Sequence, residues 1–373
     1  MKILFLEGYY GGSHRAFADG WKMSSRHDIR IMSLPDRKWK WRMQTGSWMF
    51  YEQLLKEGFS YKPDLIFATD MINLAEFLGL TRRHFGDIPS VLYFHENQFV
   101  YPARSEEPDF TWAAINVASA LAADQLIFNS KFNRDSFFDS WLKGNRRMPD
   151  VNIPEKRIHE IREKSKIIPV GVDFEFLDLY EVESSNKIPL ILWNHRWEHD
   201  KGPDEFFEVI RRLRSEGLKF HLAVCGENFS DVPDCFEKAG DEFSDIILHF
   251  GYLPTRMEYA LLLWKSDIVI STARQEFLGL SVIEAMWCGC YPLLPNRLSY
   301  PGLLPEKLHE RHLYSGADDL IVKLDMVLKG GVSGELFEAR AEFLRKFGWE
   351  TVIEMMDSGF VISEGEYNIS QKF

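Results

Sequence analysis

The 373-residue chain has few cysteines, no long apolar run and no recognisable metal motif. Its four cysteines include no CxxC pair, which argues against a zinc knuckle or a disulfide framework and favours reduced thiols in a cytoplasmic protein. No apolar run approaches the roughly 20 residues that span a bilayer. The start, MKILFLEGYYGGSH, passes directly from an apolar run into glycines, as a first strand does and a signal peptide does not. HRWEH at 195–199 lacks the order of HExxH. We therefore expect no membrane segment, no metal and no cofactor.

The net charge of -12 argues against indiscriminate binding of nucleic acid, which needs a broadly basic surface. Positive charge is nevertheless concentrated in two windows of the first half. Residues 26–42 contain six Lys or Arg and two Asp, and residues 143–166 contain eight Lys or Arg and four Asp or Glu. This asymmetry indicates a local site for a polyanionic partner.

Short apolar runs with polar exits alternate with stretches of helical periodicity along the whole chain. The series pauses at the polar segment ESSNKIP (183–189) and then restarts, which is typical of a linker between two domains. Strands that alternate with helices predict a mostly parallel sheet covered on both faces. We therefore predict an α/β fold of two Rossmann-like, doubly wound domains, over 1–182 and 183–345. The expected strands lie within 2–7, 64–70, 90–97, 124–130, 166–173, 189–195, 219–227, 245–253, 266–272 and 290–295.

Polar motifs follow most of these strands. In doubly wound sheets, ligands bind outside the carboxyl ends of the strands, so two facing sheets would share one cleft. The motifs are Glu7 to His14, Asp70, His95 to Asn97, Asn129, His195 to Lys201, and Gly226 to Asn228.

Two of these motifs suit phosphate. In GYYGGSH (8–14), three glycines after a strand allow backbone N–H groups to approach a phosphate, although a plain tight turn explains them equally well. In HRWEHDKG (195–202), Arg196 and Lys201 combine a guanidinium fork with an ammonium near a helix start. This pair suits binding of a diphosphate leaving group, and we favour that interpretation over an ordinary surface loop.

The segment EFLGLSVIE carries two carboxylates, Glu276 and Glu284, in an otherwise apolar frame. Gly279 between them lets the backbone near a helix start approach a ligand. The carboxylates suit hydrogen bonds from sugar hydroxyls and a ribose diol, since they are acceptors only. A hydrolytic acid/base pair or a solvated face are the alternatives. The apolar neighbours favour a functional role.

Arg196, Lys201, Glu276 and Glu284, in this order in a second doubly wound domain, resemble retaining glycosyltransferases of family 4, which have the GT-B fold. Eight motifs between residue 8 and about residue 294 resemble, more narrowly, the tRNA-queuosine mannosyltransferases within that family. They are GYYGGSH, LPDRKWKWR, YFHENQFVYP, FNSKFN, HRWEHDKGP, DVPD, GYLP and CGCYPL.

This resemblance implies a hexosyltransferase that moves mannose from GDP-mannose to the queuosine of a tRNA, with retention at the anomeric carbon. It implies that residues 346–373 cross back onto the first domain. It also implies that no metal is needed, because arginine and lysine neutralise the diphosphate.

The resemblance assigns roles on the donor side. Arg196 and Lys201 match the pair that binds the donor diphosphate, and Gly11 and Gly12 match the loop that faces the donor phosphates. Glu276 matches the glutamate that contacts the donor sugar.

Further roles concern the nucleoside and the acceptor. Glu284 matches the residue that holds the nucleotide ribose, and the base is expected near Gly251 and Tyr252. His95 matches the active-site histidine near the transferred sugar, although a buried histidine satisfied at a strand end is an equally good interpretation of the sequence alone. Glu96 is expected to orient the acceptor.

The stretch PDRKWKWR (35–42) is the candidate for RNA contact. Unstacked anticodon-loop bases can stack on aromatic rings while phosphates take the cations. In an extended loop, Trp39 and Trp41 would share one face, opposite Lys38 and Lys40. Tryptophans packed under a surface loop are the alternative. The predicted contacts are Arg37, Lys38, Trp39, Lys40, Trp41 and Arg42.

The sequence alone leaves two other functions open. One is a family 4 enzyme with a lipid or small-sugar acceptor, for which an amphipathic basic helix with exposed Leu and Phe would be expected. The other is a catalytically inactive RNA-binding relative, against which the presence of Arg196, Lys201 and Glu276 argues.

Overall fold

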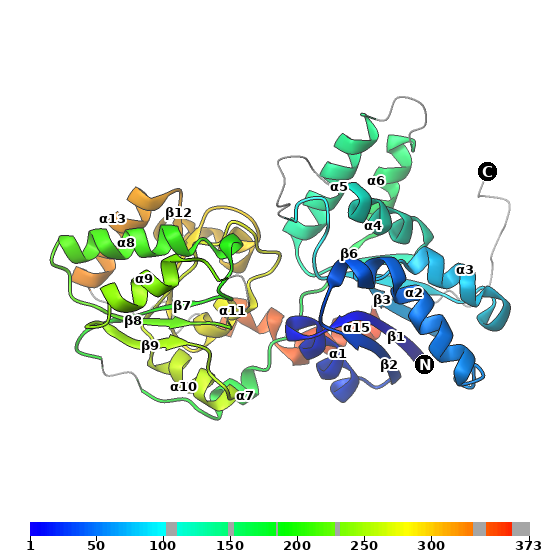
Figure 1. The fold of residues 1–373 in the computed structure, drawn as a ribbon, viewed down its shortest axis with the longest axis horizontal. Helices are drawn as coiled ribbons and strands as arrows, with labels where there is room; N and C mark the ends of the chain where they lie inside the picture. Colours follow the sequence, from blue (N-terminus) through cyan, green and yellow to red (C-terminus); the bar gives the residue numbers. More distant parts are fainter. Residues whose placement is uncertain (102–109, 148–152, 184–185, 228–231, 331–340, 360–373) are drawn as a thin grey trace.

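The computed structural model describes residues 1–101, 110–147, 153–183, 186–227, 232–330 and 341–359, which form two α/β lobes (Figure 1). The sheet of the N-terminal lobe has the order β2-β1-β3-β4-β5-β6, and all its pairings are parallel. Its strands are β1 (Lys2–Tyr10), β2 (Asp28–Pro35), β3 (Leu65–Thr69), β4 (Ser90–Phe94), β5 (Gln125–Phe128) and β6 (Lys166–Ile167). Its helices are α1 (Gly12–Ser24), α2 (Trp39–Lys56), α3 (Leu74–Phe85), α4 (Phe110–Ala122), α5 (Lys131–Asn145) and α6 (Glu155–Lys164).

The sheet of the C-terminal lobe has the order β12-β11-β10-β7-β8-β9 and is also parallel. Read from β9, this is the strand order of a dinucleotide-binding fold. Its strands are β7 (Leu190–Asn194), β8 (His221–Cys225), β9 (Ile247–Gly251), β10 (Ile268–Ile270), β11 (Tyr291–Pro295) and β12 (Leu313–Tyr314). The helices that follow β6 are α7 (Phe174–Asp178), α8 (Pro203–Ser215), α9 (Cys235–Glu242), α10 (Arg256–Lys265), α11 (Leu280–Trp287), α12 (His309–His312), α13 (Ala317–Gly330) and α15 (Trp349–Ser358).

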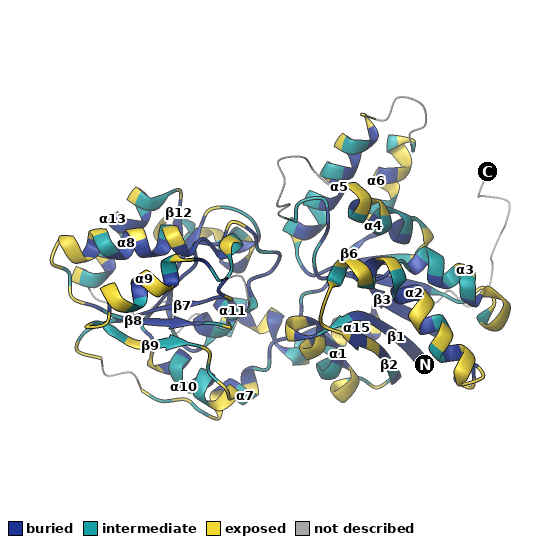
Figure 2. Cartoon of the chain, viewed as in Figure 1, coloured by how far each residue is buried: buried dark blue, intermediate teal, exposed yellow. Residues whose placement is uncertain are grey.

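The central strands are buried along their whole length, whereas the helices expose their outer sides (Figure 2). Continuous burial is what a parallel sheet covered by helices on both faces requires. The predicted α/β architecture of two doubly wound lobes is therefore confirmed. No described helix is both long and apolar enough to cross a bilayer.

The strand predicted over 166–173 is too long. Strand β6 ends at Ile167, because Pro169 cannot donate a ladder hydrogen bond. Val172 instead forms an isolated parallel bridge with Gly348, far along the chain.

The prediction of an extended loop for PDRKWKWR is wrong, because helix α2 begins at Trp39. Lys38 precedes it in the left-handed region, with φ of 54°. The helix buries Met43, Phe50 and Leu54 on one side, at helical spacing. This pattern lies beyond the eight residues of the motif, so the motif alone could not reveal it.

The last helix in the described part of the chain, α15, lies against α1 of the N-terminal lobe (Figure 1). Its first residue, Trp349, packs where a side chain on Gly20 or Gly171 would collide with the indole, at 2.3 Å in each case. Near its end, the buried Asp357 accepts hydrogen bonds from Trp21 Nε1 (3.0 Å), Ser25 Oγ (2.7 Å) and the Arg26 N–H (2.9 Å). The C-terminal segment thus completes the N-terminal lobe. The predicted domain boundaries stay predictions.

Replacing Asp357 should destabilise the fold. Burial alone would raise the pKa of Asp357, but the hydrogen bonds from Trp21, Ser25 and Arg26 lower it below its usual value. Its contribution is therefore present at neutral pH and lost as pH falls through the folded-state pKa. We expect Asp357→Ala to lower the free energy of unfolding by about 2–3 kcal/mol, because three donors lose a charged acceptor. Urea denaturation at pH 7 measures this.

Glu354→Ala is the matched control, since Glu354 is exposed on the same helix. It should change stability by no more than about 0.5 kcal/mol. Equal effects of the two substitutions would contradict the anchoring role of Asp357.

Candidate active site

One cavity of about 400 Å³ lies between the lobes, at the carboxyl ends of both sheets. The order of each sheet reverses between β1 and β3 in one lobe and between β7 and β10 in the other. The cavity is lined by residues that follow these four strands, as expected for doubly wound sheets. Of the predicted site residues, it brings together Gly11, Gly12, Trp39, His95, Glu96, Arg196, Lys201 and Glu276.

Gly11 and Gly12 form the start of helix α1 at the cavity wall. A side chain on Gly11 would overlap Asp36, 2.1 Å away, so only glycine allows this approach. Gly12 has φ of 51° and open space where a side chain would stand. The first backbone N–H groups of α1 are thus free to meet an anion.

Lys201 lies at the base of the opposite wall and is only 8% exposed. Its Nζ donates to Gln275 O (2.9 Å) and forms ion pairs with Asp200 (3.2 Å) and Glu276 (3.5 Å). Burial alone would lower the pKa of Lys201, but Glu276 and Asp200 outweigh it and raise the pKa. Lys201 therefore carries a fixed positive charge.

Glu276 holds the complementary negative charge. Burial alone would raise its pKa, but Lys201 and His195 outweigh this effect and lower the pKa. Its carboxylate also accepts from the Leu278 N–H at 3.4 Å. An ionised carboxylate held this way can accept hydrogen bonds from sugar hydroxyls.

Arg196 adds a second cation to this wall and pairs with Glu198 at 3.0 Å. Helix α11 begins beside it, after Gly279, whose φ is 93°. The cavity is therefore bordered by the N-termini of two helices, α1 and α11, and by two cations. Since helix N-termini and cations both attract negative charge, the site fits a diphosphate.

A buried ion pair underlies the N-terminal wall. His14 Nδ1 lies 3.2 Å from each carboxylate oxygen of Glu7, which is fully buried. The Tyr9 N–H (2.8 Å) and the Thr69 hydroxyl (3.1 Å) also donate to Glu7. Burial alone would lower the pKa of His14, but the charge and hydrogen bond of Glu7 raise it to about 9. His14 is therefore an imidazolium near neutral pH.

His95 lies against this imidazolium, with the two ring centroids 4.0 Å apart. Burial and the charge of His14 hold the pKa of His95 well below its usual value, so its ring is neutral. Its Nε2 is buried and has no hydrogen-bond partner among the residues that the structure describes. A neutral ring in the cavity wall with a free nitrogen can exchange a hydrogen bond with a ligand.

The backbone of His95 is held by neighbouring polar side chains. Its N–H donates to Asp70 Oδ1 (2.8 Å), and its carbonyl accepts from Asn129 Nδ2 (2.7 Å). Asn133 Nδ2 donates in turn to Asn129 Oδ1 (2.9 Å), and Asn97 Nδ2 to Asn133 Oδ1 (2.8 Å). This network fixes where His95 enters the cavity.

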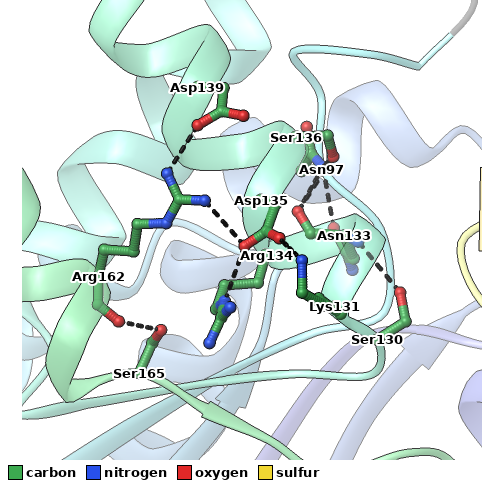
Figure 3. A network of polar contacts seen from close by, with 10 residues as sticks. All are labelled: Asn97, Ser130, Lys131, Asn133, Arg134, Asp135, Ser136, Asp139, Arg162 and Ser165. Atoms are coloured by element: carbon green, nitrogen blue, oxygen red, sulfur yellow. Dashed lines mark hydrogen bonds and ion pairs between the residues drawn. The ribbon is translucent and has the colours of Figure 1, made fainter. Parts of the chain in front are cut away.

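Figure 3 shows that Ser130 belongs to the same network, and its hydroxyl also bonds to a residue of the other lobe. Ser130 caps helix α5 by accepting from the Asn133 N–H (3.0 Å), and its hydroxyl donates to Phe277 O (2.5 Å). Phe277 follows Glu276 directly. The positions of His95 and Glu276, on opposite lobes, are thus coupled by hydrogen bonds.

Glu96 is the neighbour of His95 in the cavity wall, and its Oε1 accepts from Gln98 Nε2 at 2.9 Å. Burial raises the pKa of Glu96, partly offset by His14 and Arg196. The position fits contact with an acceptor hydroxyl, and this role stays a prediction.

The three residues predicted for the ribose and base do not line the cavity. Glu284 accepts from Tyr259 at 2.9 Å, and burial raises its pKa to about 7. It lies one turn along α11 from Ser281, which does line the cavity. Gly251 ends β9, and Tyr252 is 61% exposed. Their roles stay predictions.

The predicted RNA contacts divide into two groups. Trp39 lines the cavity and packs on Tyr101 and Trp112, with centroid distances of 5.8 and 5.6 Å. The others lie outside the cavity lining, on and before the first turn of α2: Arg37, Lys38, Lys40, Trp41 and Arg42.

The sequence pattern placed the segment from Glu7 to His14 at a strand end. It did not identify Glu7 and His14 as a functional pair. The signal was a carboxylate ending an apolar run and a histidine seven residues later. Only the fold shows that both are buried next to His95.

Among the described residues, one group has potential metal ligands close together: the ligand atoms of Glu7, His14 and His95 all lie within 4.8 Å of one another. Glu7 already accepts hydrogen bonds from Tyr9, Thr69 and His14, and the proton on His14 supplies the local positive charge. Nothing in this arrangement requires a metal. The expected absence of a metal stays a prediction.

Comparisons with solved structures place the fold. Anabaena HepE in complex with UDP has a TM-score of 0.69 at 16% identity, covering 95% of this chain and 98% of that one. The sucrose-phosphate synthase of Thermosynechococcus elongatus has a TM-score of 0.70 at 15% identity, covering 95% and 97%. A sequence model described as glycosyl transferases group 1 matches residues 180–340. The two facing lobes and the cleft between them define a glycosyltransferase with the GT-B fold.

A second sequence model, described as tRNA-queuosine alpha-mannosyltransferase N-terminal, matches residues 2–172. A Drosophila melanogaster protein named tRNA-queuosine alpha-mannosyltransferase is 34% identical over 332 residues, covering 86% of this chain and 85% of that protein. The chain belongs to the tRNA-queuosine alpha-mannosyltransferase family. The resemblance inferred from the eight motifs is confirmed.

The Glu7–His14 pair predicts a pH dependence of stability. The folded-state pKa of about 9 lies above the usual 6.5 of histidine, so the pair's contribution is complete below about pH 6.5 and lost as pH rises through 9. We expect the free energy of unfolding to fall by up to about 3 kcal/mol over this range. His14→Gln should lack this part of the pH dependence, measured by urea denaturation at several pH values.

His159→Gln is the control, since His159 is exposed on α6. It should keep the parental pH dependence. The same slope in His14→Gln as in the parent would show that His14 is not the titrating group.

Proposed function

We propose that this enzyme transfers mannose from GDP-mannose to the queuosine nucleoside in the anticodon loop of a tRNA, with retention at the anomeric carbon. The observation that carries the proposal is the 34% identity, over most of both chains, with the Drosophila tRNA-queuosine alpha-mannosyltransferase. An RNA acceptor and free cysteines, three of the four buried, favour a cytoplasmic compartment.

The donor would lie with its diphosphate between the N-termini of α1 and α11. In this pose Arg196 and Lys201 take the negative charge that develops on the leaving diphosphate, which stabilises the transition state without a metal. Glu276 accepts hydrogen bonds from hydroxyls of the donor sugar. Glu284, one turn deeper in α11, holds the ribose, and the base meets the backbone near Gly251.

The reaction exchanges one bond for another at the anomeric carbon. The bond to the diphosphate oxygen breaks and a bond to the acceptor hydroxyl oxygen forms on the same face. The leaving phosphate takes the proton of the acceptor hydroxyl, so no protein group is needed as general base. His95 contributes a neutral hydrogen-bonding ring beside the transferred sugar, and Glu96 orients the acceptor.

Mass analysis of the product tests the whole proposal. The protein is incubated with GDP-mannose and with tRNA that carries or lacks queuosine, and the tRNA is then digested to nucleosides. We expect one hexose to be added to queuosine alone. GDP should also raise the melting temperature more than UDP or ADP, because a ligand that binds the native state stabilises it. Transfer to a lipid or free sugar, or a larger shift with UDP, would overturn the proposal.

Substitution of the donor-site charges tests the mechanism. Glu276→Gln and Lys201→Ala should each lower turnover by about 10²–10³, because each removes a positioned electrostatic group. Steady-state rates with saturating GDP-mannose and tRNA measure this, and cooperative thermal melts confirm that the variants are folded.

Glu237→Gln and Lys265→Ala are the matched controls, since both residues are exposed on the same lobe, outside the cavity. They should keep the parental rate. Parental turnover in a folded Glu276 or Lys201 variant would remove the donor-site assignment.

A further inference from the structure

Helix α2 presents large apolar side chains to solvent along one side. Trp41 is 62% exposed, Trp48 52% and Met49 38%. Trp41 and Trp48 are seven residues apart, which places them on the same side of the helix, about 10 Å from each other along its axis. We call Trp41, Trp48 and Met49 the α2 aromatic face. Figure 2 shows exposed surface along this helix.

The α2 aromatic face begins within one helical turn of the active-site cleft, although Trp39 and Trp41, two residues apart, point to different sides of the helix. Asp36 and Trp39 line the cavity, and Trp41 follows within the same helical turn. Trp39 itself is packed on Tyr101 and Trp112 and forms part of the cleft wall. Of the two tryptophans in PDRKWKWR, Trp41 is the more exposed to an external partner.

Free positive charge lies at the same end of the helix. Arg37, Lys38 and Lys40 are exposed, and in the described part of the chain none of them forms an ion pair. Lys40 lies over the Trp39 and Trp112 rings, 5.5 Å from each centroid. On a chain of net charge -12, exposed cations with no ion-pair partner among the described residues indicate an anionic partner.

Several cations of the second basic window of the sequence are paired within the protein. Arg146 is paired with Glu155 at 2.7 Å, and Arg162 bonds both Asp135 and Asp139 (Figure 3). These cations are neutralised within the protein. The first window borders the cleft and combines its cations with an exposed tryptophan ring, so it is the better place for contacts with RNA.

Neighbouring contacts hold the face in place. Trp48 donates its indole N–H to Glu76 on α3. Arg42 donates to Pro35 O (3.2 Å) and to Met49 Sδ (3.5 Å), which links the end of β2 to Met49 of the face. Side chains already fixed lose less conformational entropy when they bind.

We propose that the α2 aromatic face binds unpaired nucleotides of the tRNA anticodon loop next to the nucleoside that enters the cleft. Flat exposed rings interleaved with cations suit a partner that carries both bases and phosphates, because bases stack on aromatic side chains while phosphates pair with cations. The spacing of about 10 Å between Trp41 and Trp48 equals about three base steps of 3.4 Å. The proposal rests on the proposed tRNA acceptor and names the surface that selects it.

Binding to two RNAs of equal length tests the proposal. One is the anticodon stem-loop of the tRNA, and the other is a fully paired duplex without unstacked bases. We expect Trp41→Ala and Trp48→Ala each to weaken stem-loop binding about 5- to 150-fold, which corresponds to the loss of one stacked base, and to change duplex binding little. Fluorescence anisotropy at several salt concentrations measures both.

Charge variants give a contrasting result. Arg37→Gln, Lys38→Gln and Lys40→Gln should weaken binding of both RNAs alike. Each should also lower the salt slope by roughly 0.7–0.9 for every phosphate that the protein no longer neutralises. Met23→Ala is the matched apolar control, since Met23 is 88% exposed on α1. It should bind both RNAs as the parent does.

The outcomes separate this proposal from the proposed function. If the parent adds hexose to queuosine but the tryptophan variants bind the stem-loop normally, the α2 aromatic face is not an RNA surface. If the variants lose stem-loop binding but the parent transfers no hexose, the surface stands and the proposed function fails. If the variants instead abolish self-association or binding to lipid vesicles and keep RNA binding, the face belongs to a protein or membrane partner and the proposal is overturned.

Discussion

Because all strand pairs in both sheets are parallel, the chain segments that follow the strands gather along one edge of each sheet. That constraint turns residues scattered over the sequence into two opposed walls. Gly11, His95 and Glu96 come from one edge, and Arg196, Lys201 and Glu276 come from the other. The positions of these groups therefore depend on the sheets, whose strands are buried, and not on the loops alone.

Each wall contains ion-paired side chains that set the charge of the groups around them. Glu7 and His14 place a positive charge behind the neutral ring of His95, and Lys201 and Glu276 hold opposite charges at the donor side. The hydrogen bond from Ser130 to Phe277 O connects the two walls. The charged groups of the cleft are thus in place before any ligand enters. Such preorganisation is the condition for electrostatic stabilisation of a transition state.

The sequence predicted the two-lobed fold, because buried parallel strands read as short apolar runs with polar exits, and it predicted most of the cleft, because those exits carry the polar motifs. It did not predict that α2 starts at Trp39, since the buried Met43, Phe50 and Leu54 that define the helix lie beyond the motif. It also did not predict that Glu284 lies behind the cavity wall with Tyr259. The pairing of Glu7 with His14, and its contact with His95, depends on three separate elements meeting in space.

The chain passes between the lobes twice at almost the same point, where Val172 N–H donates to Phe347 O (2.7 Å) and Trp349 N–H donates to Val172 O (3.2 Å). The N-terminal lobe is consequently built from two pieces of sequence far apart, with the whole C-terminal lobe inserted between them. A fragment that stops after the first sheet would lack Trp349, which packs against Gly20 and Gly171, and Asp357, which accepts a hydrogen bond from the Trp21 indole. On a ribosome, the first lobe therefore cannot complete its packing until the segment from Trp349 to Asp357 has been synthesised.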